Sequence, residues 1–332
     1  MFLLRTARII RAEKLLSTRS ARNGFWKMSW DTDDIYSSDD DRPKTPQERD
    51  CCGGGCSPCI FDSHKIALEE WRNRRTYSTK AQNAGDKTQK NLLSPASYTK
   101  FIITNRTDAA EDYFRLQLEH KDHKTGNNNL HFVPGQFVIL NSDSKSRPYT
   151  ALTWTDKSFD ILVRWYKDGE FSTLLKTISL GSAINVRGPY GKFKYQRNSF
   201  QDIVMFGIGS GIAPFYPIVR TIVSDSNEET RIHLIAGFQT VAHVPLKKEL
   251  QKLTDFWNFK CTLYLSDETN EKTIHIHGFD VKIGLLTKLL TATHLQSKDR
   301  EKTLVLICGS PEFNNVMKQW VQEVNYTNMH VF

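Results

Sequence analysis

The spacing of apolar segments changes near residue 200, and this change constrains the fold more than any other feature of the chain. Between Tyr98 and Tyr195, short β-type segments follow one another with turn residues between them and with little helical periodicity. They cover residues 98–104, 113–118, 136–140, 148–154, 159–166 and 183–187. Closely spaced strands of this kind predict an antiparallel barrel of roughly a hundred residues.

After Asp202 the pattern changes, because strand-like and helix-like segments now alternate. The predicted strands are residues 203–207, 231–237, 260–265 and 303–308. The last helical segment begins near Pro311, and its apolar residues recur at helical spacing from Phe313 to Val324. Alternation of this kind predicts a second domain, an α/β domain built on an open parallel sheet with flanking helices.

The 332 residues are enough for two domains and some additional chain. We predict an antiparallel β-barrel over residues 98–197 and an α/β parallel-sheet nucleotide-binding domain over residues 198–332. A leader and acidic linker, residues 1–45, precede them and are predicted to be partly disordered, since six aspartates fall between Asp31 and Asp41. Residues 46–75 form a cysteine-rich segment, and residues 76–97 form a polar linker.

The net charge of +8 is concentrated at the start of the chain. Residues 1–30 hold seven Lys and Arg against Glu13, which leaves only +2 for the other 302 residues. We therefore expect no nucleic-acid partner. An Arg-rich, acid-poor start predicts mitochondrial targeting. The alternatives are a disordered or membrane-surface tail, or a cytoplasmic protein that starts at Met28. No apolar run approaches the length of a transmembrane helix.

Two motifs suggest binding chemistry. Arg147-Pro148-Tyr149-Thr150 lies on a predicted barrel strand, where a guanidinium can pair with phosphate oxygens and an aromatic face can cover a planar ring. Gly209-Ser210-Gly211 joins a predicted strand to a helix, where glycines let the backbone approach a pyrophosphate. Each motif alone also fits an ordinary strand or turn.

Together, in this order, the motifs resemble the NADH-cytochrome b5 reductases of the ferredoxin-reductase superfamily, over about residues 98–332. The resemblance implies that Arg147 pairs with the FAD pyrophosphate, that Tyr149 packs along the flavin, and that Thr150 lies near flavin N5. Pro148 completes that signature. It also implies cofactor contacts on the next strand and turn, at Val163, Arg164, Tyr166, Gly169, Phe171 and Ser172. Glu170 departs from the lysine of the family and places an acid near the phosphates.

The second domain carries the rest of the resemblance. Gly209, Ser210 and Gly211 match the family's nicotinamide-dinucleotide turn, although Ser210 and Ala213 stand where threonines are usual. Cys308-Gly309 matches the family's cysteine beside the nicotinamide, whereas an isolated buried cysteine is often only a small hydrophobic residue. Asp267 matches the acid that favours NADH over NADPH, although a solvated loop aspartate would look the same.

The resemblance implies an FAD-dependent enzyme that takes a hydride from NADH and passes single electrons to a haem protein of the cytochrome b5 type. Thr150 and Cys308 are the predicted catalytic positions. Two alternatives stay open. The acceptor could instead be an iron–sulfur or other redox partner, or the chain could be a non-enzymatic docking or assembly factor built on a decayed reductase. The non-enzymatic alternative is favoured by four departures from the family pattern, at Arg164, Glu170, Ser210 and Ala213.

The cysteine-rich segment places four cysteines within nine residues, at Cys51, Cys52, Cys56 and Cys59. It resembles the short oxidoreductase-like N-terminal domain that accompanies some reductase-like proteins. Four clustered thiols are consistent with a structural metal or iron–sulfur site, with a redox-active thiol pair, or with a docking segment whose thiols stay reduced.

Overall fold

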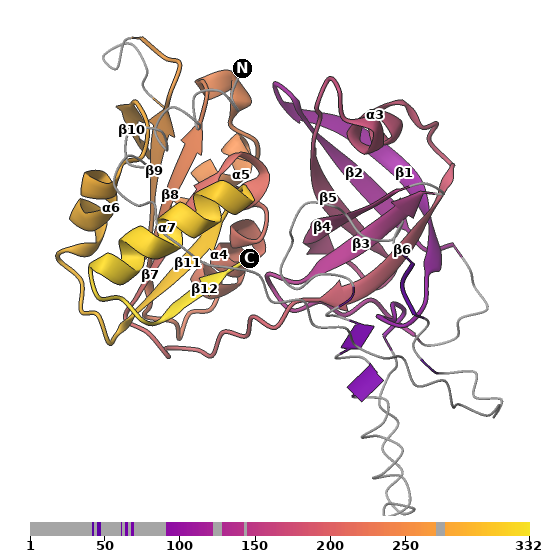
Figure 1. Cartoon of the computed structure of the whole chain (residues 1–332), viewed down its shortest axis with the longest axis horizontal. Coiled ribbons are helices and arrows are strands. Elements are labelled where there is room, and N and C mark those ends of the chain that lie inside the picture. The colour runs from indigo at the N-terminus through magenta and orange to yellow at the C-terminus, as the bar shows by residue number, and fades with distance from the viewer. Residues whose placement is uncertain are drawn as a thin grey trace, which may run out of the picture. The chain divides into compact units, whose positions relative to one another are not determined.

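The computed structural model describes residues 42, 45–47, 61, 64–65, 68–69, 91–121, 128–142, 145–269 and 276–332. The described part therefore holds the predicted barrel and parallel sheet almost entirely (Figure 1). The predicted leader at residues 1–30 and the four clustered cysteines lie outside the described residues.

The first folded region is a closed antiparallel barrel, as the sequence predicts. Among the described residues its strands run in the order β1-β2-β5-β4-β3-β6. Their bounds are β1 (Thr99–Ala110), β2 (Tyr113–Glu119), β3 (Phe137–Ser142), β4 (Lys145–Trp154), β5 (Ser158–Arg164) and β6 (Ala183–Tyr190).

Alternating side chains fill the barrel, because successive residues of a strand point to opposite faces. Ile161 and Val163 of β5 belong to its interior cluster, together with Val138 and Leu140 of β3. The helix α3 (Glu170–Thr177) lies at one end of the barrel (Figure 1) and buries Phe171 and Leu175 in the same cluster.

The second region is a parallel sheet, again as predicted. In the described chain the strand order is β10-β9-β8-β7-β11-β12, and neighbouring strands are parallel. The strands are β7 (Asp202–Ile208), β8 (Arg231–Phe238), β9 (Phe259–Leu265), β10 (Phe279–Ile283), β11 (Thr303–Cys308) and β12 (Met329–Val331). The connecting helices are η4 (Gly209–Ile212), α4 (Phe215–Val223), η5 (Val241–His243), α5 (Lys247–Leu253), α6 (Lys288–Leu295) and α7 (Pro311–Glu323).

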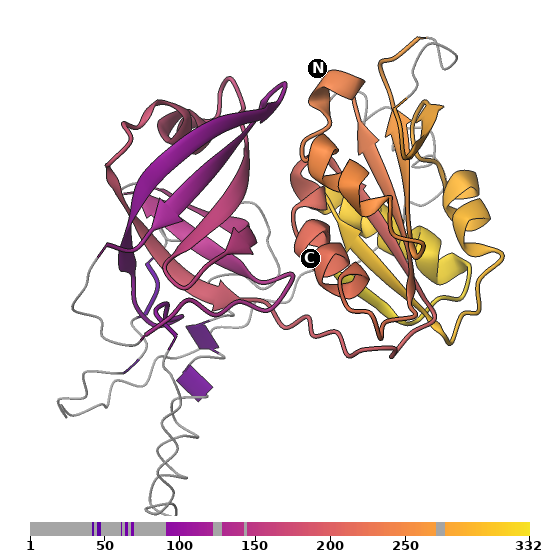
Figure 2. The same ribbon diagram turned by 180° about the vertical axis from the view of Figure 1, so that it is seen from behind.

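Helices cover both faces of this sheet (Figures 1 and 2). Ile203 and Met205 of β7 pack in a cluster with residues of α4 and α5. Val204 and Phe206, which alternate with them, pack in a cluster with residues of α6 and α7. A strand buried on both faces explains the continuous apolar run that the sequence shows here.

The structure extends the prediction at the edges of the elements. β1 runs to Ala110, six residues beyond the predicted strand. Two outer strands, β10 and β12, were not predicted. Both are short and only partly buried, so their sequences lack the apolar run that marks the central strands.

The parallel topology determines where a site can form, because the carboxyl ends of parallel strands lie along one edge of their sheet. The segments that follow β7, β8, β9 and β11 therefore share an edge, and they contain Gly209, Thr240, Asp267 and Gly309. No helix in the described part of the chain combines the length and the apolar character that crossing a membrane requires.

Candidate functional site

The four residues of the predicted flavin signature lie on β4. Strand alternation puts Arg147 and Tyr149 on one side and Pro148 on the other, paired with Ile139 of β3. The Tyr149 ring stacks on Phe171 of α3, with 6.3 Å between ring centroids. Burial raises the pKa of Tyr149, while the nearby Arg147 acts in the opposite direction. The tyrosine is therefore a neutral aromatic surface beside a guanidinium.

The start of α3 lies next to this pair and is suited to an anion. Gly169 is the N-cap residue, and no side chain of the described residues caps the helix. A Cβ on Gly169 would lie 2.6 Å from Ser172 Oγ and 2.9 Å from Tyr166 Cβ, so this position requires glycine. Ser172 Oγ accepts a hydrogen bond from the Tyr166 amide at 3.1 Å and holds the turn closed. The first amides of α3 stay available for a phosphate.

Glu170, which departs from the family pattern, is the first residue of α3, and the charge of Arg147 also acts on its carboxylate. Its side chain is 74% exposed and forms an ion pair with Lys145. The hydrogen bond and charge of Lys145 lower the pKa of the Glu170 carboxyl. The acid is therefore neutralised at the surface by a residue of β4.

Arg164 at the end of β5 connects the barrel to the glycine-rich turn. Its guanidinium lies over the rings of Tyr166 and Tyr113, at 5.0 Å and 5.6 Å from their centroids. Its Nε is buried and has no hydrogen-bond acceptor among the described residues. Its Nη1 lies 3.2 Å from the position that a Cβ on Gly209 would occupy. By contrast, the side chain of the preceding Val163 packs inside the barrel, so only its backbone can face a ligand.

The glycine-rich turn after β7 passes very close to the end of β11. Gly209 has a φ of +56°, which favours glycine. A Cβ on Gly211 would lie 2.1 Å from the carbonyl oxygen of Cys308. A Cβ on Gly309 would lie 2.5 Å from the Phe313 ring. The two turns are therefore in backbone contact, and Ser210 lies between the glycines at a partly exposed position.

Cys308, the last residue of β11, is a free and partly exposed cysteine. Burial raises the pKa of its thiol to about 12, so the sulfur is neutral at physiological pH. A neutral thiol is a soft packing surface rather than a nucleophile. This favours a positioning role for Cys308 over covalent chemistry.

Asp267 follows β9 and is exposed. Its amide donates to the carbonyl of Gln239 at 2.8 Å, which ties it to the segment after β8. The parallel topology thus places this carboxylate on the same sheet edge as the glycine-rich turn.

One residue of the site was missed from the sequence. Tyr113 begins β2 and is the strand partner of Arg164. Its hydroxyl lies 3.0 Å from the position of a Cβ on Gly209, and burial raises its pKa to about 12. Only the pairing of β2 with β5 could have pointed to it, because no local motif surrounds it.

These residues fit a flavin dinucleotide and a nicotinamide dinucleotide. The uncapped start of α3 and Arg147 suit a pyrophosphate, and Tyr149 offers an aromatic face. The turns at Gly211 and Cys308 lie so close together that no side chain fits between them. A nucleotide bound there would therefore contact backbone atoms. The role of each of these residues in binding a cofactor is a prediction.

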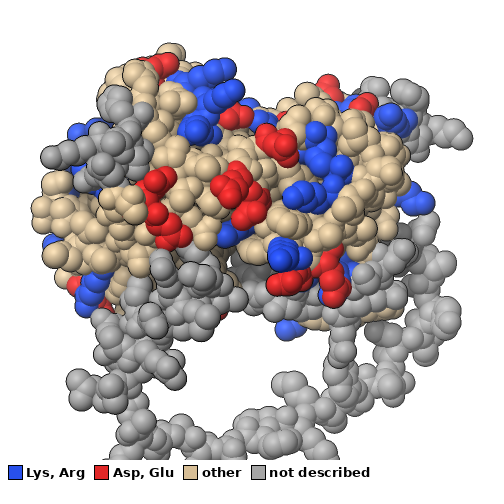
Figure 3. Space-filling model, turned by 90° about the horizontal axis from the view of Figure 1, so that it is seen from above, with Lys and Arg blue, Asp and Glu red and all other residues tan. Residues whose placement is uncertain are grey.

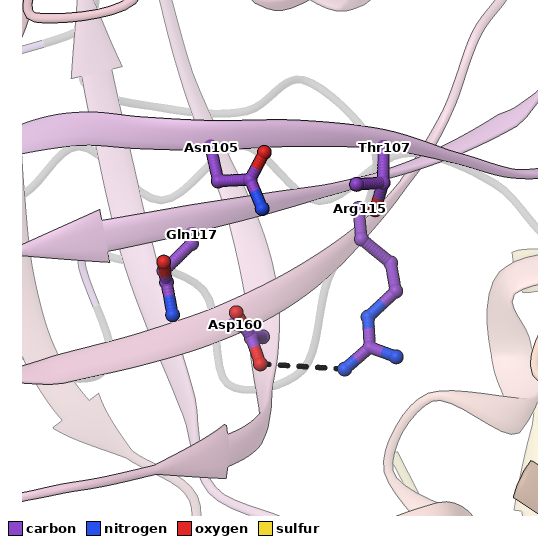
Figure 4. A pocket seen from close by; sticks show the side chains of 5 residues that line it. All are labelled: Asn105, Thr107, Arg115, Gln117 and Asp160. Atoms are coloured by element: carbon purple, nitrogen blue, oxygen red, sulfur yellow. Dashed lines mark hydrogen bonds and ion pairs between the residues drawn. The ribbon is translucent and has the colours of Figure 1, made fainter.

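A separate polar pocket of about 190 Å³ lies on the barrel surface (Figure 4). Arg115 of β2 and Asp160 of β5 point toward one another there and form an ion pair at 3.3 Å. Arg115 also bonds Glu249 of α5 at 2.5 Å, so it links the barrel to the α/β region. The pocket contains none of the predicted cofactor residues.

The metal prediction falls on Cys51, Cys52, Cys56 and Cys59, which lie outside the described residues. Within the described ranges, no three His, Cys, Asp or Glu side chains come together as a metal site.

Three protein-family models match this chain. The oxidoreductase FAD-binding domain matches residues 100–195, and the oxidoreductase NAD-binding domain matches residues 205–319. The N-terminal domain of oxidoreductase-like proteins matches residues 40–80.

Curated relatives decide the family. NADH-cytochrome b5 reductase 1 of Eremothecium gossypii is 34% identical over 223 residues, which cover 64% of this chain and 72% of the relative. The chain belongs to the NADH-cytochrome b5 reductase family. The mouse NADH-cytochrome b5 reductase-like protein is 29% identical over 303 residues, which cover 88% of this chain and 94% of the relative. The chain is thus a flavoprotein oxidoreductase with FAD-binding and NAD-binding domains, as the sequence predicts.

Solved structures show the same fold. The cytochrome b5 reductase domain of Ulva prolifera nitrate reductase aligns with a TM-score of 0.63 at 19% identity, and covers 73% of this chain and 99% of that domain. The CS-b5R domains of human Ncb5or align with a TM-score of 0.60 at 21% identity, and cover 71% of this chain and 69% of that one.

Proposed function

We propose that this reductase takes a hydride from NADH onto FAD and passes single electrons to a haem protein of the cytochrome b5 type. Bound FAD would supply the chemistry that converts a two-electron donor into a one-electron donor. The observation that carries the proposal is the position of Arg164. This residue ends a strand of the flavin-type barrel and lies against Gly209 of the nucleotide-type turn.

The residues of the chain bind and orient the two cofactors. Arg147 and the first amides of α3 would hold the FAD pyrophosphate, and Tyr149 would cover the flavin. Thr150, a partly exposed hydroxyl on the same strand, would donate a hydrogen bond near flavin N5. Cys308 would pack its neutral thiol against the nicotinamide. A hydride transfer depends on this positioning more than on a protein acid or base.

Asp267 supports a preference for NADH. An exposed carboxylate on the carboxyl edge of the sheet would repel the additional phosphate of NADPH. Asp267→Asn should therefore lower the preference for NADH, measured as kcat/KM with NADH divided by kcat/KM with NADPH.

The acceptor proposal rests on the relatives, whose names specify cytochrome b5. Basic side chains also gather in clusters on one face of the chain, with acidic ones between them (Figure 3). Electrostatic encounter with an acidic haem rim would be fast at low salt and slower at high salt. Stopped-flow mixing of NADH-reduced enzyme with cytochrome b5 tests this. We expect a rate that falls steeply with ionic strength, and a rate independent of salt would contradict the proposal.

An iron–sulfur or other redox partner is the second candidate, because four clustered cysteines precede Phe61 in the sequence. Phe61, two residues after Cys59, packs with Phe137, Ile139 and Tyr190 of the barrel. If Cys59→Ser slows electron transfer to cytochrome b5, the segment relays electrons.

The non-enzymatic alternative loses support from Glu170, since this residue pairs with Lys145 at the surface. We also propose that residues 1–30 direct the chain to mitochondria, on their charge alone. A fluorescent protein fused to residues 1–30 should accumulate there, whereas a diffuse cytoplasmic signal would favour a start at Met28.

A further inference from the structure

The buried guanidinium of Arg187 on β6 has no role in the site described above. Arg187 is only 4% exposed and is the strand partner of Ile139 on the outer side of the barrel. Its Nε and Nη2 have no hydrogen-bond acceptor among the described residues. Leaving the donors of a buried cation unpaired is costly, so such a group points to a missing acceptor.

The two unpaired nitrogens are significant because of where their hydrogens point. The Nε–H and one Nη2–H lie on the same edge of the planar guanidinium, and together they form a fork of parallel donors. This fork matches two oxygens of a phosphate or a carboxylate. The Tyr98 ring lies 4.6 Å from the guanidinium carbon and stabilises its charge. A ring face below the plane does not accept these in-plane hydrogens.

Other basic groups converge on the same place from the N-terminal segment. Phe61 packs in a cluster with Ile139, the strand partner of Arg187, and His64 follows Phe61 by three residues in the sequence. Burial lowers the pKa of His64, and the charges of Arg187 and Arg42 lower it further. No carboxylate contributes to this shift. The charges of Arg187 and Arg42 therefore both act on the His64 ring.

We propose that Arg187, His64 and Arg42 form a binding site for an oxyanion of the phosphate class, located between the N-terminal segment and the outer face of β3 and β6. A phosphate group carries up to two negative charges and three acceptor oxygens, so it can satisfy the Arg187 fork and still face the other two groups. A single carboxylate offers less charge to the two guanidinium groups. This site is distinct from the cofactor site and does not depend on the proposed acceptor.

The test uses the full-length, FAD-loaded protein, so that the pyrophosphate site at Arg147 is already filled. Melting temperatures are compared in inorganic phosphate and in chloride at matched ionic strength, and again with glycerol 3-phosphate. At roughly ten times its Kd, a ligand that binds only the folded state should raise the melting temperature by about 2–4 °C.

Arg187→Met should abolish the phosphate-dependent rise. This variant should remain folded, because methionine replaces an unpaired buried cation with an apolar side chain of similar length. Arg197→Met is the matched control, since Arg197 pairs with Asp225 elsewhere on the surface, and it should keep the rise. His64→Leu should weaken the response several-fold.

The source of the phosphate follows from the two ligands. A rise with inorganic phosphate supports a free anion, and a rise with glycerol 3-phosphate alone supports a phosphate ester. The proposal is overturned if wild-type protein responds to neither, or if Arg187→Met responds as wild type does. Neither result depends on NADH oxidation, so this inference and the proposed function can fail separately.

Discussion

The barrel and the parallel sheet approach their ligands in opposite ways. The barrel presents side chains, such as Arg147, Tyr149 and Arg164, from the strand β4 and the end of β5. The sheet presents backbone, because Gly211 and Gly309 let two turns meet where any Cβ would clash. Substitutions in the barrel should therefore remove a ligand without changing the fold, and substitutions in the sheet should change the geometry of a turn.

The largest effect is expected on the barrel side, from Arg147→Glu. Replacing a phosphate-binding cation with an anion should cost about 4 kcal/mol, or roughly a thousandfold in the Kd for FAD. Flavin absorbance after gel filtration measures the occupancy, and circular dichroism should show an unchanged fold because Arg147 is partly exposed. Arg197→Gln is the control and should stay yellow. Full flavin occupancy in Arg147→Glu would show that this side chain of the barrel does not bind FAD.

The next effect is expected on the sheet side, from Gly211→Ala. The new Cβ would lie 2.1 Å from the Cys308 carbonyl oxygen, so the turn must move. A displacement near 1 Å can slow a positioned reaction about a hundredfold. Stopped-flow reduction of the bound flavin by NADH measures the rate, with Arg197→Gln, a change in a surface ion pair, as the control. If Gly211→Ala lost FAD instead, the barrel and the sheet would not bind their ligands independently.

Arg164 tests the connection between the two regions. Arg164→Ala removes the guanidinium that lies between Tyr113 and Tyr166 and faces the turn at Gly209. We expect a loss of roughly tenfold in kcat/KM for NADH, while FAD stays bound. Arg164→Lys should recover only part of it, because an ammonium does not stack as a guanidinium does. An unchanged KM in both variants would argue against a nucleotide contact.

The smallest effect on catalysis is expected at Cys308. Its thiol keeps its proton below pH 9.0, so the rate of flavin reduction should not titrate through this group there. The raised pKa of this thiol should instead affect how the free energy of unfolding depends on pH. The folded thiol holds its proton up to about pH 12, whereas the unfolded thiol releases it near 9.0. The free energy of unfolding should therefore fall as the pH rises through this window.

Cys308→Ser provides the comparison, since serine does not ionise in this range. Alkaline denaturation curves of the two proteins should diverge above pH 9.0, and parallel curves would show that the thiol is not buried in the folded state.

Much of the fold could be predicted, because burial leaves a periodic record in the sequence. The central strands β7, β8, β9 and β11 are buried on both faces and read as apolar runs. The outer strands β10 and β12 carry no such record. Local motifs likewise indicated Arg147 and Gly211. Tyr113 and the pair Arg115–Glu249 could not be predicted, since they depend on strand pairing and on contacts between residues far apart in the chain.

The central claim is that the barrel binds a flavin which NADH reduces through the glycine-rich turn of the sheet. The visible spectrum of the purified full-length protein, recorded before and after NADH is added, tests this most directly. The account predicts the absorbance of an oxidised flavin, which bleaches when NADH is added. A colourless protein that takes up no added FAD, or a flavin that NADH does not bleach, would contradict it.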